Sequence, residues 1–476
     1  DVYVAGRFSG NGTFGQESLV ARKRDGSDGV VLRLDAATGA VEWIAHNPGR
    51  GRVGHGDIVA VESAGGEVSL YTTGVFEGSS EFGNSTISGD DNRLFISRLR
   101  DNGTDGQFVW VDQFGGMSLG AAVSGDPELA VDGSGRIYVA DSFGGDAQFG
   151  NLTLSGGPDW TGFVVSVTDQ GSAPSFDWVN AATGGQNEAP IGNNGAQATG
   201  IDFDNGVVYV SYVFADVLEL QSSDGNSQFL SSRGGKDMAV ARYAPDGKAL
   251  AAQRTGGSGY DYIGTPGPFE AHDGMIYFTV ASQSTDLVIP VSSLNSAVPD
   301  PFPNLSGNQE YGEEYVLAKL NSAAPVVDAD GPVSGTVGSP LSLSSHAVAG
   351  DLITDLSASI VWTDEAGNVI GTGPILQFSA GDLNAGTHRF VASVEDPASG
   401  LTGLDGVVVE IADVPSTIQF AIDDVSVVEG YSGTSVAKFT VTRTGDTDVD
   451  ASVQYETQDD TATAPTDYFD IALTTL

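Results

Sequence analysis

Apolar and polar residues alternate with a period of two in short runs along most of the chain. Val30–Leu34 and Phe163–Val167 are examples, and Gly, Asp, Asn and Ser separate one run from the next. A period of two is typical of β-strands that bury one face, and the runs are too short for ordinary helices. The pattern therefore predicts an all-β protein made of short strands and tight turns.

The strand pattern repeats every 67 to 71 residues through the first 320 residues. A strand with tyrosine and an apolar strand recur in every repeat, and the first three also have a Phe-Gly pair and a strand with tryptophan. Each repeat therefore supplies about four strands. One four-stranded sheet cannot bury both of its faces, and repetition around an axis solves this. We therefore predict a β-propeller of at least five four-stranded blades over residues 1–324. The tyrosines that mark the repeats are Tyr3, Tyr71, Tyr138, Tyr209 and Tyr277.

These repeats resemble the bacterial β-propeller repeat family abbreviated SBBP over residues 1–322. Val30–Asp35 followed by Trp43 is a good copy of its pattern, and Phe114-Gly115-Gly116 matches its closing glycines. The resemblance implies a propeller fold and an extracytoplasmic setting. The first copy lacks the strand before Tyr3 and the fifth lacks the tryptophan strand after Leu320. We therefore expect an upstream peptide to supply both strands and close the ring.

Residues 325–413 have a different pattern, with about seven short strands in some 90 residues. This spacing is typical of an immunoglobulin-like sandwich, and Trp362 fits a buried position in its core. Ala385–Asp396 resembles a strand of PKD and bacterial Ig-like domains.

Residues 414–476 carry a third pattern. Val427-Val428-Glu429-Gly430, the strand Phe439–Arg443 and the run Tyr455–Tyr468 resemble a Calx-β domain over residues 415–476, of which we expect the later strands to be absent. In that family, acidic residues at one end of the sandwich bind Ca²⁺. The resemblance thus implies calcium ligands among the acids at matching positions, and the alternative is solvated loop acids. These positions are Glu429, Asp459 and Asp467.

The chain has 63 acidic and 20 basic residues, a formal net charge of −43. Such a surface repels nucleic acid and anionic lipid. Two explanations of this charge remain. The acids form a solvated surface suited to salty water, or some of their carboxylates converge on Ca²⁺, which prefers oxygen ligands. Cysteine is absent, so disulfides and thiolate chemistry are excluded. No apolar run is long enough to predict a membrane span.

Several short motifs resemble catalytic or ligand-binding motifs but are explained more simply as connecting loops and turns. Gly116–Gly120 fits G-x-S-x-G and Gly49–Gly54 fits G-x-G-x-x-G, yet both occupy the same place between repeats and neither precedes a predicted helix. Asp328 and Asp330 resemble half of a calcium loop where the propeller meets the sandwich, and the alternative is an Asp/Gly turn. The five histidines form no zinc-binding pattern.

The sequence therefore predicts a non-catalytic protein of the extracellular space or a bacterial cell surface, of adhesin type, with calcium-stabilised β-modules. Its partners would be an extracellular protein, a glycan, or copies of itself. The alternative is a glycan-binding or glycan-acting protein that uses the propeller channel. Aromatic residues between repeats are candidates for stacking on sugars, and the alternative for them is packing within the fold. They are Tyr260, Tyr262 and Phe269.

Overall fold

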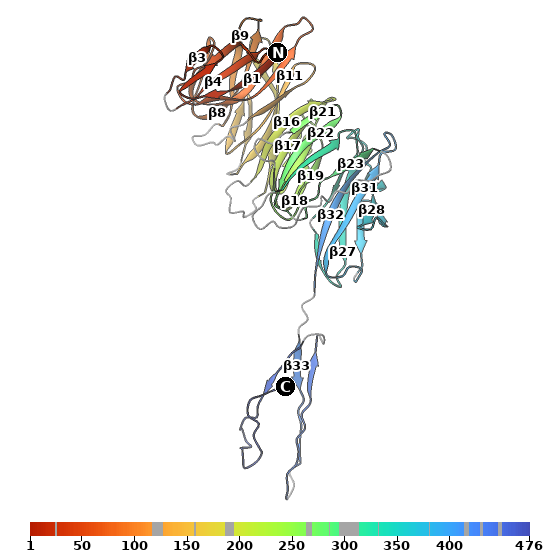
Figure 1. The fold of residues 1–476 in the computed structure, drawn as a ribbon. Coiled ribbons are helices and arrows are strands. Elements are labelled where there is room, and N and C mark those ends of the chain that lie inside the picture. The colour runs from red at the N-terminus through yellow and green to blue at the C-terminus, as the bar shows by residue number, and fades with distance from the viewer. Residues whose placement is uncertain are drawn as a thin grey trace. The chain divides into compact units, whose positions relative to one another are not determined.

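The computed structural model describes most of the chain, and its elements are β-strands apart from one 3-10 turn at Ser357–Ser359 (Figure 1). This confirms the prediction of an all-β protein. The chain divides into two compact units, Asp1–Ile411 and Ala412–Leu476. The described residues are 1–23, 26–116, 127–156, 159–185, 195–262, 269–284, 286–294, 314–331, 333–379, 381–413, 418–428, 432–445 and 450–476.

The first unit begins with five antiparallel groups of strands that follow the sequence repeat. We number them groups 1 to 5, and pairing between β15 and β17 joins groups 3 and 4 into one larger sheet. Group 1 contains β1 (Val2–Phe8), β4 (Asp28–Leu34) and β5 (Val41–Asn47). Group 2 contains β6 (Val53–Glu62), β7 (Val68–Phe82), β8 (Ser85–Asp101) and β9 (Gly106–Gly116). Group 3 contains β10 (Glu128–Val131), β11 (Arg136–Phe143), β14 (Thr161–Asp169) and β15 (Pro174–Thr183). Group 4 contains β16 (Ala196–Asp204), β17 (Val207–Leu220), β18 (Gln228–Tyr243) and β19 (Ala249–Thr255). Group 5 contains β20 (Asp261–Tyr262), β21 (Phe269–His272), β22 (Met275–Ser282) and β24 (Glu314–Asn321).

Consecutive groups pack on one another in series. β6 packs on β1, β10 on β6, β16 on β10 and β11, and β21 on β16. A hydrophobic core lies at each of the four contacts, because each strand buries alternate residues toward its neighbour. Among the described strands this series does not form a closed ring. The propeller ring therefore stays a prediction.

The Phe-Gly pairs form hairpin arms that link the groups. In groups 1 and 3 the arm is a separate hairpin, β2 (Asn11–Phe14) with β3 (Glu17–Val20) and β12 (Asp146–Phe149) with β13 (Leu152–Ser155). The glycines have φ between 57° and 62°, a left-handed backbone that favours glycine. A Cβ on each would lie 2.9–3.5 Å from a side chain on the last strand of the same group. The pairs are Gly15 with Val41, Gly83 with Phe108, and Gly150 with Phe176.

Each later arm also pairs with the last strand of the group before it. β12 pairs with β9 through Ala147 and Gly116, and the end of β17 pairs with β15 through Leu220 and Ala182. An isolated bridge between Gly49 and Ser80 does the same for groups 1 and 2. The arms therefore extend backbone hydrogen bonding across each of these three contacts.

A single carboxylate of group 2 binds three side chains of group 1. Tyr3 donates its hydroxyl proton to Asp101 Oδ2 over 2.7 Å, and Trp43 Nε1 donates to Oδ1 over 3.1 Å. The guanidinium of Arg33 lies 3.0 Å from Oδ2. Group 2 binds group 3 in the same way, since Tyr71, Arg98 and Trp110 contact Asp169 at 2.8, 2.9 and 2.9 Å.

The third contact keeps the tryptophan and arginine donors and changes the acceptor, while Tyr138 donates to Asp132 of its own group. Trp178 Nε1 and Arg136 Nη1 of group 3 donate to the backbone carbonyl of Pro245 over 3.0 and 2.9 Å. A tryptophan and an arginine of one group thus meet an oxygen acceptor at the end of the third strand of the next group. We call this recurring arrangement the inter-group contact.

The environment of Asp101 keeps the carboxylate ionised. Burial alone raises its pKa, but hydrogen bonds from Tyr3 and the Gly103 N–H, together with Arg33 and Trp43, outweigh burial and lower the pKa below the ordinary value. Burial and the bond to Asp101 raise the pKa of Tyr3 to about 12. A carboxyl with a lowered pKa stabilises the fold above its unfolded pKa and loses that effect as the pH falls through the folded value.

Two facing sheets complete the first unit and share one core. The buried Trp362 lies in this core and donates Nε1–H to the carbonyl of Gly373 over 2.9 Å, which confirms its predicted burial. One strand of the larger sheet, β23 (Val291–Leu294), precedes the predicted start of the sandwich at residue 325. The other strands of that sheet are β26 (Val333–Thr336), β28 (Val361–Asp364), β29 (Val369–Thr372), β31 (Gly386–Glu395) and β32 (Leu401–Ala412). The facing sheet contains β25 (Val326–Ala329), β27 (Leu341–Val348) and β30 (Ile375–Phe378).

The second unit contains two short hairpins. β33 (Gln419–Ile422) pairs with β34 (Val441–Thr444), and β35 (Gln454–Tyr455) pairs with β36 (Thr474–Thr475). None of its described residues is buried, and apolar side chains such as Val428 and Phe469 are exposed. The described part of this unit thus has no hydrophobic core of its own.

We predict that Asp101→Ala lowers the stability of the first unit. The variant leaves Tyr3, Trp43 and Arg33 without their shared acceptor, and the loss of a buried charged partner costs about 2–4 kcal/mol. The measurement is the free energy of unfolding by urea, followed by tryptophan fluorescence. Asp105→Ala, an exposed acid on the same turn, is the matched control and should change the stability by less than about 0.5 kcal/mol. Equal effects of the two substitutions would contradict the role given to Asp101.

Candidate functional site

Two predicted calcium ligands of the second unit lie in one exposed loop. Asp459 Oδ1 accepts hydrogen bonds from the Ala464 N–H and the Tyr468 hydroxyl, both over 2.8 Å. Asp467 Oδ2 accepts from the Thr463 N–H over 2.8 Å. These bonds fold residues 459–468 into a compact turn that carries both acids. Hydrogen bonds from Ala464 and Tyr468 lower the pKa of Asp459, so this carboxylate is ionised at neutral pH.

The loop has the chemistry that calcium requires but only part of the ligand number. Among the described residues, the turn uses one oxygen each of Asp459 and Asp467, and Asp459 Oδ2 and Asp467 Oδ1 remain as ligand atoms. Ca²⁺ takes six to eight oxygen ligands. Glu429, the third predicted ligand, lies outside the described residues. Further oxygen donors are needed to complete a site here.

The predicted calcium loop at residues 328–331 meets an arginine. Asp328 Oδ1 lies 3.3 Å from Nη2 of the buried Arg254 on β19, and the same nitrogen donates to the Ala329 carbonyl over 2.6 Å. Asp330 accepts a hydrogen bond from the Ser344 hydroxyl over 2.5 Å. A guanidinium therefore supplies positive charge at the place where the calcium alternative would need an ion.

A second buried arginine joins group 4 to the two-sheet region. Arg233 Nη2 donates to Asp405 Oδ2 over 2.8 Å and to the Gly406 carbonyl over 2.7 Å, and both side chains are at most 2% exposed. Asp405 Oδ2 also accepts from the Ala329 N–H over 2.9 Å. These bonds connect β18, β25 and β32, and they make the junction a buried ionic network.

This junction also holds a carboxyl group with one oxygen unsatisfied. Asp237 is fully buried, its Oδ2 accepts from the Arg233 N–H, and its Oδ1 has no hydrogen-bond partner in the described structure. Burial raises the pKa of Asp237 to about 7, and the nearby Asp261 adds to the rise, while Arg254 and Arg233 oppose it. The network therefore contains a group that titrates near neutral pH.

The three aromatic candidates for sugar stacking are all partly buried. Tyr262 and Phe269 pack against the core between groups 4 and 5, and Phe269 lies against Gly200. The ring of Tyr260 lies against Gly235, where a Cβ would meet it at 3.1 Å. These contacts fit the alternative in which the three aromatic rings pack within the fold.

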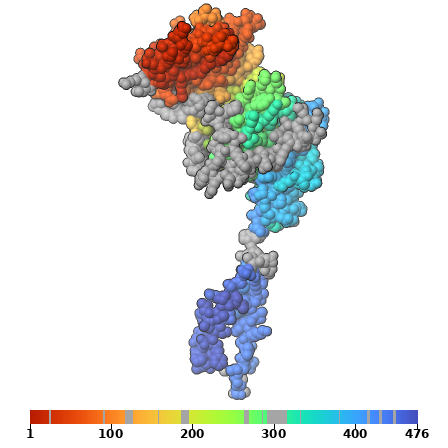
Figure 2. All heavy atoms as spheres, in the orientation of Figure 1, coloured from red at the N-terminus to blue at the C-terminus, as the bar shows by residue number. Residues whose placement is uncertain are grey.

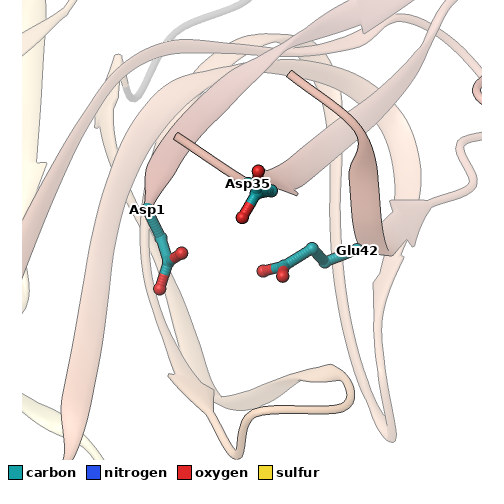
Figure 3. A group of neighbouring side chains, drawn as sticks. All are labelled: Asp1, Asp35 and Glu42. Atoms are coloured by element: carbon teal, nitrogen blue, oxygen red, sulfur yellow. The ribbon is translucent and has the colours of Figure 1, made fainter. Parts of the chain in front are cut away.

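One cluster of acids that the sequence did not reveal lies on group 1. Ligand atoms of Asp1, Asp35 and Glu42 lie within 4.8 Å of one another (Figure 3). Arg33 binds two of these acids, with Nη2 2.6 Å from Asp1 and Nε 2.8 Å from Glu42. Asp35 accepts two hydrogen bonds from Thr38. One guanidinium offsets only part of the charge of three carboxylates, so the cluster stays negative. Arg33 joins it to the ion-pair network around the inter-group contact.

We predict that Asp237→Asn flattens the pH dependence of stability. A carboxyl whose folded pKa of about 7 exceeds the unfolded value of about 3.9 stabilises the fold below pH 4, and this effect is lost as the pH rises through 7. The asparagine variant keeps an acceptor for Arg233 and has no proton to lose. The thermal midpoint of the wild type should therefore fall more between pH 5 and pH 8 than that of the variant. Asp246→Asn, at an exposed acid in the β18–β19 turn, should show the same pH dependence as the wild type. If the thermal midpoint of Asp237→Asn falls as much between pH 5 and pH 8 as that of the wild type, the raised pKa assigned to Asp237 is refuted.

Comparison with known proteins identifies one region of the chain. Residues 412–475 match the family model of the Calx-beta domain, which confirms this part of the sequence prediction. No curated protein matches the chain. Among the described residues, no helix is long and apolar enough to cross a membrane.

Proposed function

We propose that this chain is a non-catalytic extracellular surface protein of adhesin type, in which β-modules present a recognition surface and Ca²⁺ stiffens the Calx-beta domain. The match of residues 412–475 to that domain carries the proposal. The two acids Asp459 and Asp467 on one turn supply hard oxygen ligands of the kind calcium prefers. A net charge of −43 favours cation binding and solubility outside the cell.

The first unit serves this function as a frame, with groups 1 to 5 as blades of a propeller. The repeat in the sequence, the four-stranded groups and the serial packing support this fold. The two-sheet region around Trp362 fits an immunoglobulin-like sandwich of the PKD kind. Loops on such rigid frames are the usual places for recognition. The partly buried aromatic candidates do not favour the alternative of a glycan-acting site.

Calcium titration of the whole chain tests the proposal. Isothermal titration calorimetry should give binding with a dissociation constant on the order of 10⁻⁴ M, as in other extracellular calcium modules. The double variant Asp459→Asn, Asp467→Asn should weaken it at least about tenfold, because each lost carboxylate removes charge and a ligand atom. Asp273→Asn, at an exposed acid of group 5, is the control and should leave binding unchanged.

The outcomes separate the proposal from general attraction of cations to an acidic surface. Equal weakening by the loop variant and by Asp273→Asn would show diffuse attraction only. The absence of any calcium heat with the wild-type chain would overturn the calcium part of the proposal.

A further inference from the structure

Basic residues are concentrated at the start of this acidic chain. Residues 1–100 hold 10 of the 20 Lys and Arg residues but only 13 of the 63 Asp and Glu residues. These residues form group 1 and most of group 2, drawn red to orange in Figure 2. With Asp101, Asp105 and Asp112 included, the first two groups hold 10 basic and 16 acidic residues, whereas the remainder of the chain holds 10 basic and 47 acidic residues.

Two loops of groups 1 and 2 lie side by side and bring the cations together. The loop after β3 and the glycine-rich loop between β5 and β6 are joined by a bridge between Ser27 and Arg52 and by a hydrogen bond from the Val53 N–H to the Ser27 carbonyl. A Cβ on Gly26 would lie 2.1 Å from the Gly51 carbonyl oxygen, so only glycine permits this close approach.

The same region includes the β7 arm and the end of β1. Arg50 N–H donates to the Ser79 carbonyl, and the Glu77 N–H donates to the Arg52 carbonyl, each over 2.7 Å. The side chain of Arg7 lies along Gly54, where a Cβ would be 2.9 Å from its Cδ. The loops therefore hold their cations at a surface fixed by backbone hydrogen bonds.

Five exposed cations form this surface, which we call the basic patch. Arg22 donates from its two terminal nitrogens, Nη1 and Nη2, to the carboxylate of Glu81 over 2.5 and 2.9 Å. The other four have no carboxylate within ion-pair distance among the residues that the structure describes. The members of the patch are Arg7, Arg22, Lys23, Arg50 and Arg52.

Nearby acids leave an excess of positive charge on the patch. Glu77 and Glu81 are the described acids of the adjoining arm. Asp28 is buried and is bound by His46 and by the N–H groups of Arg22 and Gly49, so it contributes little to the exposed surface. Four cations therefore remain available to a ligand.

We propose that the basic patch binds an anionic polysaccharide through its carboxylate or sulfate groups. The planar guanidinium of arginine matches such oxyanions with paired hydrogen bonds. The acidic remainder of the chain repels wide polyanionic surfaces such as membranes and duplex DNA. A narrow, extended polysaccharide can contact the basic patch without approaching the acidic remainder of the protein. This inference goes beyond the proposed function, because it requires neither calcium nor residues 412–475.

Binding of the whole chain to defined polymers at low salt tests the inference. The probes are oligogalacturonate, which carries carboxylates, and dextran sulfate, which carries sulfate esters, with uncharged dextran as the reference. Biolayer interferometry should show binding to one or both anionic probes and none to dextran. The anionic probe that binds more tightly identifies the group recognised.

Two double variants with the same change in charge locate the binding. Arg50→Gln with Arg52→Gln should weaken binding roughly tenfold or more, since two charge-assisted contacts are lost. Lys248→Gln with Lys319→Gln, at exposed positions of groups 4 and 5, should leave it within about twofold. An unchanged thermal midpoint shows that each variant is folded. Equal effects of the two variants, binding of single-stranded DNA as tight as that of either glycan, or no binding to either anionic probe would each overturn the inference.

Discussion

The packing of groups 1 to 3 depends on a single carboxylate at each of the two contacts between them. A tyrosine, an arginine and a tryptophan come from three strands of one group, and all three bind an aspartate at the end of the third strand of the next. The charged acceptor satisfies donors that would otherwise be buried without partners, and an unsatisfied buried donor is costly. The shared acceptor thus joins three strands of one group to the next group, beside the hydrophobic core between them.

Charge has different roles in different parts of the first unit. At the inter-group contacts, partly buried arginines bind a carboxylate or a backbone carbonyl, and at the junction with the two-sheet region buried arginines bind carboxylates. Breaking such a buried pair is strongly destabilising, because the remaining charge is left without a partner. On the loops of groups 1 and 2, arginines are exposed and largely unpaired. Some of the basic residues of this chain thus join its parts, and others form the basic patch.

The sequence predicted the elements well because their signals are local. Alternation gave the strands, and the Phe-Gly pairs marked turns whose glycines take the left-handed backbone. The partners across groups were harder to predict, because Tyr3 and Asp101 are 98 residues apart. Tyr71 and Asp169 have the same separation, so the repeat did contain this signal. Arg233 and Asp405 are 172 residues apart and follow no period, and no sequence pattern indicates that pair. The loop with Asp459 and Asp467 was predictable because a family motif covers it.

Hydrogen exchange, followed by mass spectrometry on the Asp169→Ala variant, tests most directly whether the inter-group contact holds neighbouring groups together. If it does, peptides from β7–β9 and from β11–β14 both exchange faster than in the wild type, while peptides from residues 418–476 exchange at the same rate. Faster exchange confined to the turn around Asp169, with both groups as protected as before, would contradict the account.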